Sequence, residues 1–192
     1  MFDTSKFLAE YPEFDGIAQT AVTATGTRED DIVENMFVCS SHDYVMLFSN
    51  LGRMYRIKAY EIPKGSRTSK GMNMVNIVPL MPGEKITVIL PASELDEEKY
   101  IAMVTKKGTI KRTKVAEFRN TRKSGIIAIN LDEGDELRWV KLTDGEQNLM
   151  VATRKGMSIC FKENDARAIG RTARGVRAIT LADGDEVVGM VI

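Results

Sequence analysis

The sequence predicts an all-β, propeller-like fold of repeated four-stranded blades, because one pattern of about fifty residues occurs three times along the chain. Each copy has an apolar strand, a polar turn that ends in glycine and a strand with basic residues, at positions 46–58, 103–114 and 151–162. A basic loop that ends in glycine, an apolar strand and an acidic turn come next in each copy. Long stretches with the 3.6-residue helical period are scarce, which favours strands.

Glycines keep the same register in the three copies. The loop glycines Gly71, Gly125 and Gly175 are 54 and 50 residues apart, and the glycines of the acidic turns, at positions 83, 134 and 184, are 51 and 50 apart. Glycine tolerates the positive φ that tight hairpin turns need. We therefore expect equivalent hairpin turns at Gly52, Gly108 and Gly156.

The repeat register divides the chain into one repeat domain over residues 1–192. We expect a partial first blade with a divergent N-terminus over 1–35, and blades over 36–92, 93–142 and 143–192. The partial blade rests on a weaker fourth copy, in which Phe7–Tyr11 matches Lys114–Phe118. Because the chain opens inside a blade and closes where a strand ends, we expect a piece of a longer protein.

Composition excludes several classes of protein. No apolar run approaches the 18 or so residues of a membrane span, and no signal peptide opens the chain, which predicts a cytoplasmic protein without a membrane partner. We expect Cys39 and Cys160, which lie in strand-like segments, to be buried free thiols, although a disulfide stays possible in principle.

The sequence contains little that could support catalysis. His42 is the only histidine, and without a cysteine cluster it cannot build an ordinary zinc site. The chain has no nucleophile-elbow pattern, no Walker loop and no dinucleotide-binding glycine motif. We therefore expect this chain to have no enzymatic activity of its own and no cofactor or metal.

The net charge of zero hides an asymmetry. Residues 1–52 carry two bases and nine acids, so the remaining residues carry an excess of seven positive charges. In each copy the acids gather at the turns, and the bases gather in the second hairpin strand and in the loop after it. A basic stripe on a folded surface indicates a polyanion site, although the same charges could simply solvate the surface.

The first copy contains two specific stretches, at 52–63 (Gly-Arg-Met-Tyr-Arg-Ile-Lys-Ala-Tyr-Glu-Ile-Pro) and 66–71 (Ser-Arg-Thr-Ser-Lys-Gly). With these stretches the chain resembles the C-terminal domain of the DNA gyrase A subunit, and the similarity covers about residues 26–192. The resemblance implies a β-pinwheel, a propeller-like ring whose neighbouring blades exchange strands. It also implies a basic outer rim that binds and wraps duplex DNA, so that one segment is presented for ATP-dependent strand passage by a type IIA topoisomerase.

The implied partners are duplex DNA, the catalytic domains of the parent enzyme and its ATPase (B) subunit. The active-site tyrosine of that parent isomerase lies in a domain outside this chain. The family's basic, glycine-rich box falls by register on residues 12–16, which are acidic here (Pro-Glu-Phe-Asp-Gly). We therefore expect the chain to bind or bend DNA but to constrain little writhe. The topoisomerase IV A subunit is the close alternative within the family.

Lysine and arginine on the rim would replace the counterions of the phosphates and position DNA without reading its bases. A propeller that binds proteins would use the same fold, and a propeller hydrolase would need convergent acids that the sequence does not offer. The predicted DNA-binding residues are Arg53, Arg56, Lys58, Arg67, Lys70, Lys106, Lys107, Lys111, Arg112, Lys114, Arg122, Lys123, Arg154, Lys155, Lys162, Arg171, Arg174 and Arg177.

Overall fold

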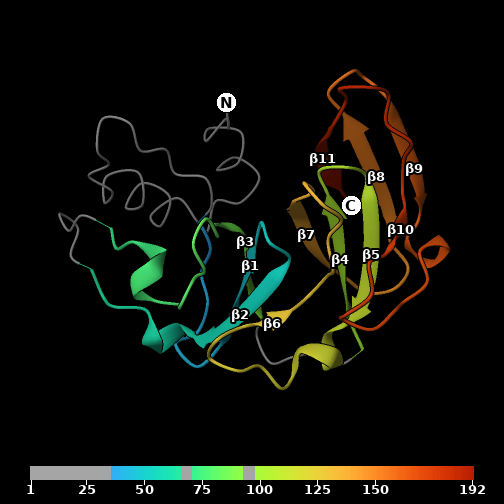
Figure 1. Ribbon diagram of the computed structural model, residues 1–192. Helices are drawn as coiled ribbons and strands as arrows, with labels where there is room; N and C mark the ends of the chain where they lie inside the picture. The colour runs from blue at the N-terminus through green and yellow to red at the C-terminus, as the bar shows by residue number, and fades with distance from the viewer. Residues whose placement is uncertain (1–35, 66–70, 93–97) are drawn as a thin grey trace, which may run out of the picture. The chain divides into compact units, whose positions relative to one another are not determined.

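The computed structural model describes residues 36–65, 71–92 and 98–192, and it divides into two compact units. One unit comprises Met1–Met36 with Pro63–Asn73, and the other comprises Phe37–Ile62 with Met74–Ile192. The strands of the described residues all belong to the second unit (Figure 1). The expected partial blade over 1–35, the acidic stretch 12–16, and Arg67 and Lys70 lie outside the described residues.

The second unit is all-β, as predicted, and its strands form three antiparallel sheets. The first sheet has the order β3-β1-β2-β6, with β1 Tyr44–Ser49, β2 Arg53–Lys58, β3 Ile86–Ala92 and β6 Ile126–Ile127. The second has the order β10-β5-β4-β7, with β4 Tyr100–Thr105, β5 Thr109–Lys114, β7 Leu137–Thr143 and β10 Val176–Arg177. The third has the order β11-β8-β9, with β8 Asn148–Thr153, β9 Ser158–Lys162 and β11 Val187–Val191.

Short 3-10 helices follow the second hairpin strands. They are η2 Ala59–Glu61 after β2, η4 Val115–Phe118 after β5 and η5 Glu163–Asp165 after β9, and a further one, η3, spans Met74–Asn76. In each of the three repeats this helix turns the chain out of the hairpin and into the basic loop.

Neighbouring sheets exchange strands. β6 belongs to the second repeat, but it pairs with β2 of the first, where Met54 lies opposite Ile126. β10 belongs to the third repeat and pairs in the same way with β5, where Ile110 lies opposite Val176 (Figure 1). The strand exchange that the family resemblance implied is therefore confirmed.

The hairpin glycines occupy equivalent turns, which confirms the repeat register. Gly52, Gly108 and Gly156 have φ angles of 73°, 83° and 85°. Each amide donates a hydrogen bond to the carbonyl three residues earlier, with N···O distances of 3.0, 3.1 and 3.1 Å. At the first two turns the glycine carbonyl also accepts backbone hydrogen bonds from the exchanged segment, for example from the Ala128 amide at 2.8 Å.

The first hairpin strand is buried on both faces in the first sheet. Because successive side chains of a strand point to opposite faces, Met46 and Phe48 of β1 enter the hydrophobic cluster shared with the second sheet. Val45 and Leu47 enter a separate cluster with Val78. This burial on both faces explains the continuous apolar run of β1.

β4 repeats this arrangement one blade later. Ile101 and Met103 face the first sheet, whereas Ala102 and Val104 face the third. In the third sheet, β8 buries Leu149 and Val151 toward the second sheet. Met150, which lies between them in the strand, points to the opposite face and is 41% exposed. The third sheet therefore contributes to the hydrophobic core with one face only.

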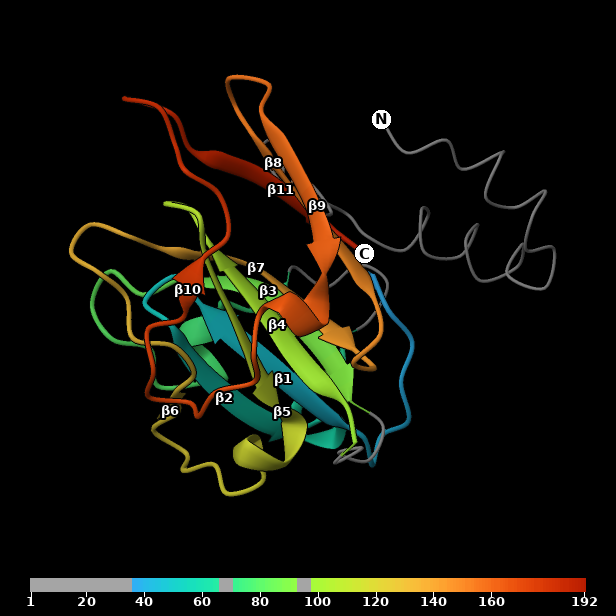
Figure 2. The same cartoon turned by 90° about the vertical axis from the view of Figure 1, so that its right-hand side faces the viewer.

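The two cysteines are free thiols, as expected, but the prediction that both are buried is wrong, because Cys160 is exposed and Cys39 is only partly buried. Cys160 lies on β9, an edge strand of the third sheet (Figure 2). In the first two sheets the equivalent strands β2 and β5 are covered at their start by β6 and β10. No strand among the described residues pairs with the outer edge of β9.

Candidate polyanion interface

Arginine side chains from three repeats converge on one cavity of about 710 Å³. β2 contributes two of them, the segment between η4 and β6 contributes two, and the loop of the third repeat contributes one. The other lining residues are polar and uncharged or apolar, and none is acidic. We call this cavity the arginine pocket and define it by Arg53, Arg56, Arg119, Arg122 and Arg171.

Arg53 begins β2 and is held at the pocket by the neighbouring loop. Its Nη2 atom donates a hydrogen bond of 2.6 Å to the carbonyl of Ser124. Its Nε atom lies 4.0 Å from Oε1 of Glu84, and this Nε is buried without a hydrogen-bond partner. Because this Nε atom is buried, only the Nη groups of Arg53 can reach a ligand in the pocket.

The Glu84 carboxylate lies beneath Arg53 and is fully buried. Its Oε2 atom accepts hydrogen bonds from the Tyr55 hydroxyl at 2.7 Å and from the Met81 amide at 2.8 Å. Burial, together with the smaller effect of the hydrogen bond to Glu84, raises the pKa of Tyr55, so this hydroxyl stays a proton donor to the carboxylate. Glu84 therefore supplies a fixed negative charge behind Arg53 and outside the lining of the pocket.

Arg56 leans on an aromatic ring at the surface. Its guanidinium carbon lies 4.3 Å from the centroid of the Tyr44 ring, and Nζ of Lys58 lies 3.4 Å from the same centroid. Such contacts are favourable for cations. β2 thus presents Arg56 without an acidic partner among the described ion pairs.

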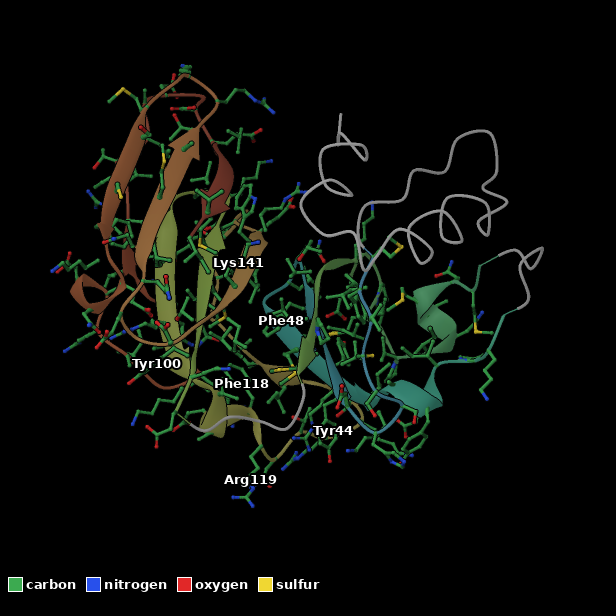
Figure 3. All side chains as sticks on the ribbon, turned by 180° about the vertical axis from the view of Figure 1, so that it is seen from behind. Tyr44, Phe48, Tyr100, Phe118, Arg119 and Lys141 are labelled. Carbon is green, nitrogen blue, oxygen red and sulfur yellow. The ribbon has the colours of Figure 1, made fainter. Side chains whose placement is uncertain are left out.

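Gly125 brings the basic loop of the second repeat against β2. It has a φ of 76°, and a Cβ atom at this position would lie 2.6 Å from Cε1 of Tyr55. Only glycine allows the backbone to pass this close to the ring with positive φ. The close approach places Arg122 beside Arg53 in the pocket. Arg119, which follows η4, projects outward below Phe118 (Figure 3).

Arg171 enters the pocket from the third repeat. Its carbonyl accepts a hydrogen bond from Nζ of Lys111, and its Nη1 atom makes a long contact of 3.5 Å with the Ile127 carbonyl. Its Nε atom is buried without a hydrogen-bond partner. The carbonyl of Thr172 accepts a hydrogen bond from the side-chain amide of Asn130, which ties the same loop to the second repeat.

Two predicted DNA-binding residues lie inside the fold. Lys111 is 1% exposed and donates hydrogen bonds to main-chain carbonyls. Arg112 is 6% exposed, stacks on Tyr100, and pairs with the fully buried Glu163 at 3.2 Å. Strand alternation cannot expose either residue, because both faces of β5 are covered. Neither side chain can therefore belong to a DNA-binding surface.

Several other predicted bases lie next to acids. At the hairpin turns, Lys106 and Arg154 pair with Glu186, and the ammonium groups of Lys107 and Lys155 donate to carbonyls of the acidic turns. Arg174 pairs with Asp132 at 2.9 Å, with both side chains exposed. The hairpin-turn bases thus neutralise the acidic turns, and a uniform basic side of each blade is not formed there.

The structure brings together four of the sequence-predicted residues in the arginine pocket, namely Arg53, Arg56, Arg122 and Arg171. Sequence reasoning missed Arg119, which lies one residue before the loop 120–125 that was recognised as basic. Its position directly after η4 was the available signal, because the chain leaves the hairpin there. The predicted residues whose side chains form none of the described ion pairs or side-chain hydrogen bonds and stack on no aromatic ring are Lys114, Arg122, Lys123, Lys162 and Arg177.

The part of the chain that the structure describes has no candidate metal cluster and no membrane-spanning helix. Its His, Cys, Asp and Glu side chains form no group of three that could hold a metal ion. No helix among the described residues is long and apolar enough to cross a membrane.

Comparison with known proteins places the repeats in a family. The family model described as "DNA gyrase C-terminal domain, beta-propeller" matches residues 43–93, 99–144 and 147–192. The DNA gyrase A subunit of Clostridium acetobutylicum is 48% identical over 156 residues, which are 81% of this chain and 19% of that relative. The chain therefore spans only a small part of the length of this relative.

Two solved structures are similar to this chain. The "Crystal structure of the C-terminal domain of DNA topoisomerase IV" superposes with a TM-score of 0.80 at 26% identity, covering 94% of this chain and 55% of the other. The "Structure of DNA gyrase A C-terminal domain" gives a TM-score of 0.65 at 27% identity, covering 79% of this chain and 48% of the other.

Proposed function

Because the chain belongs to the family of DNA gyrase C-terminal domains, we propose that it is the DNA-binding domain of a type IIA topoisomerase. In this proposal the domain holds duplex DNA by its phosphate backbone. The observation that carries the proposal is the arginine pocket, whose lining includes five arginines and no acidic residue.

Phosphate is the ligand that best matches this arrangement. Guanidinium groups present planar pairs of donors that fit phosphate oxygens, and they stay charged at any physiological pH. In the described hydrogen bonds Arg53 uses only its Nη2 atom and Arg171 only its Nη1 atom, so each guanidinium keeps a further Nη group that could donate to phosphate. Neutralising phosphates releases condensed counterions from DNA, which favours binding without base recognition.

The pocket would be one contact point along a longer basic track on the surface. Lys123 adjoins it, and Lys114, Lys162 and Arg177 add charges on the second and third repeats. Repeated phosphate contacts along such a track would offset the few kcal/mol that bending a short duplex costs. We propose that the bent segment is presented to the catalytic domains and the ATPase subunit of a cytoplasmic parent enzyme, which performs the ATP-dependent strand passage.

The test of DNA binding compares two pairs of substitutions that remove the same charge. One pair is Arg122→Ala with Arg171→Ala in the pocket, and the control pair is Arg154→Ala with Lys155→Ala at a hairpin turn, where both bases contact acidic-turn groups. Affinity for a duplex of random sequence is measured by fluorescence anisotropy over a series of salt concentrations. Log K falls with log salt, and each lost phosphate contact reduces the magnitude of this slope by about 0.9.

We expect the pocket pair to make the salt dependence less steep by the equivalent of about two phosphate contacts and to weaken binding of all sequences alike. The control pair should change the salt dependence and the affinity much less. Circular dichroism verifies that all variants keep the fold. Equal effects of the two pairs would remove the arginine pocket from the interface. Binding that does not respond to salt would argue against phosphate recognition and favour a protein-binding propeller.

The wrapping part of the proposal needs a topological measurement. A nicked plasmid is closed by ligase in the presence of the chain, and the linking number is then compared with that of the control. Because residues 12–16 are acidic where the family's basic box would fall, we expect only a small change. A strong, positive and stoichiometric shift would mean that the basic track closes without such a box.

A further inference from the structure

Lys111 is a buried cation in the middle of β5. It is 1% exposed, and its Nζ atom donates hydrogen bonds to the carbonyls of Ala128, at 2.7 Å, and Arg171. No acidic side chain forms an ion pair with it among the described residues. By the repeat register, the equivalent positions hold Tyr55 and Ile159, so the fold itself does not require a lysine here.

The two carbonyls belong to different repeats. Ala128 follows β6, and its amide donates to the Gly52 carbonyl of the first hairpin. Arg171 lies in the basic loop of the third repeat. One ammonium group on the second sheet therefore joins the segment that completes the first sheet to the loop that precedes β10.

This junction lies directly behind the arginine pocket. Ile127, the neighbour of Ala128, lines the pocket, and so does Arg171 itself. The Arg171 side chain has only the long contact with the Ile127 carbonyl to orient it within the described part of the protein. Its position in the pocket thus depends on its main chain, which the Lys111 ammonium group holds.

Stability does not explain why a cation is kept at this position. Burial and then the nearby Arg171 charge lower the pKa of Lys111 to about 8, and only the Glu117 charge acts in the opposite direction. A buried charge without a counter-ion is costly, and an apolar side chain of similar size is often as stable or more stable at such a site. The two accepting carbonyls point to a role in placing the loop.

We propose that Lys111 is a positioning residue of the arginine pocket, holding the Arg171 main chain against residue 128 so that the Arg171 guanidinium lines the pocket. This inference rests on the proposed function only where it concerns phosphate binding. The placement of the loop can be measured in the free protein.

The first measurement is amide hydrogen exchange of the full chain without DNA, with Lys111→Met compared with Lys114→Met. Lys114 ends the same strand and is exposed, and no described ion pair joins it to another residue. The reporters are the amide of Ala173, which donates to the Gly170 carbonyl, and the amide of Asn130, which donates to the Ala173 carbonyl. Lys111→Met should speed exchange of both by about tenfold, as expected for the loss of a charge-assisted hydrogen bond. Lys114→Met should leave both rates unchanged.

The second measurement is a double-mutant cycle on DNA affinity, at a temperature where every variant is fully folded. In the wild-type background Arg171→Ala should weaken binding several-fold, and in the Lys111→Met background it should have little further effect, because residues of one network are not additive. In the Lys114→Met background the Arg171→Ala effect should persist in full. Thermal unfolding serves as a separate readout, since a purely structural lysine would lower affinity only in step with stability.

The outcomes separate the two proposals. Unchanged exchange of Ala173 and Asn130 in Lys111→Met, or additive affinity losses in the cycle, would overturn the positioning role. Faster exchange in Lys111→Met, together with a DNA affinity that Arg171→Ala does not change in any background, would support the positioning of the loop. The same result would overturn the arginine pocket as the DNA site.

Discussion

Alanine at the three hairpin glycines tests the strand exchange, because the three turns share a backbone conformation but differ in what lies above them. All three glycines have positive φ, between 73° and 85°. A Cβ atom at Gly52 would lie 2.5 Å from the Ile129 carbonyl oxygen, and one at Gly108 would lie 2.9 Å from that of Ile179. At Gly156 nothing in the described chain lies within 4 Å.

The common part of the cost is the left-handed backbone, which destabilises a residue other than glycine by about 1–2 kcal/mol. At the first two turns the obstructing atoms are backbone atoms of the exchanged segment, which cannot rotate away. Overpacking of this kind costs a further 1–3 kcal/mol or so. We therefore expect Gly156→Ala to cost about 1–2 kcal/mol, and Gly52→Ala and Gly108→Ala to cost roughly 2–5 kcal/mol each.

Urea unfolding, monitored by far-UV circular dichroism and by the fluorescence of Trp139, measures these differences. Gly170→Ala is the matched control, because Gly170 has neither a positive φ nor an atom within 4 Å of its Cβ position, and it should change stability by less than about 0.5 kcal/mol. Equal losses at Gly52, Gly108 and Gly156 would show that the exchanged segments do not press on the first two turns in solution.

Three further predictions concern buried or exposed polar groups. Glu163→Ala should destabilise the chain by about 3–5 kcal/mol in urea unfolding, because it leaves the buried Arg112 charge without an acidic partner, whereas Asp165→Ala on the same 3-10 helix should have little effect. Since the pKa of Lys111 is about 8 in the folded state and 10.5 in its ordinary state, the unfolded chain binds more protons between these values. Stability should therefore rise with pH across this window by about 3 kcal/mol, and Lys111→Met should abolish the rise. Thiol labelling read out by mass spectrometry should modify exposed Cys160 before partly buried Cys39, and the reverse order would contradict the assigned exposure of β9.

The repeat explains why so much of the fold could be predicted from the sequence. The turns at Gly52, Gly108 and Gly156 depend on local backbone conformation, and a residue type reports such a conformation directly. The pairing of β2 with β6 joins positions that are more than seventy residues apart, and periodicity marks a strand without naming its partner. Strand exchange was therefore available only through resemblance to a family.

The basic residues show the same division. Residues near the loop glycines, such as Arg122 and Arg171, were predicted correctly to lie in polar loops, but their convergence on Arg53 depends on three repeats meeting in space. Lys111 and Arg112 were placed on the surface because charged residues are seldom buried. Their burial results from the loops of the third repeat, whose path no local pattern of β5 encodes.

Strand exchange also means that the sequence repeat, which a gene duplication would copy, and the completed sheet, which folds as a unit, have different boundaries along the chain. A duplication copies a stretch from one hairpin to the next, yet each completed sheet takes its short outer strand from the next copy along the chain, as β2 does from β6 and β5 from β10. Loss or gain of one whole copy therefore keeps a donor strand for each acceptor strand, since β6 and β10 pair with their acceptors in the same way. A cut between two sheets, by contrast, removes an edge strand from a neighbour. Blade number can thus vary among descendants of such a gene more readily than the sequence at any single junction.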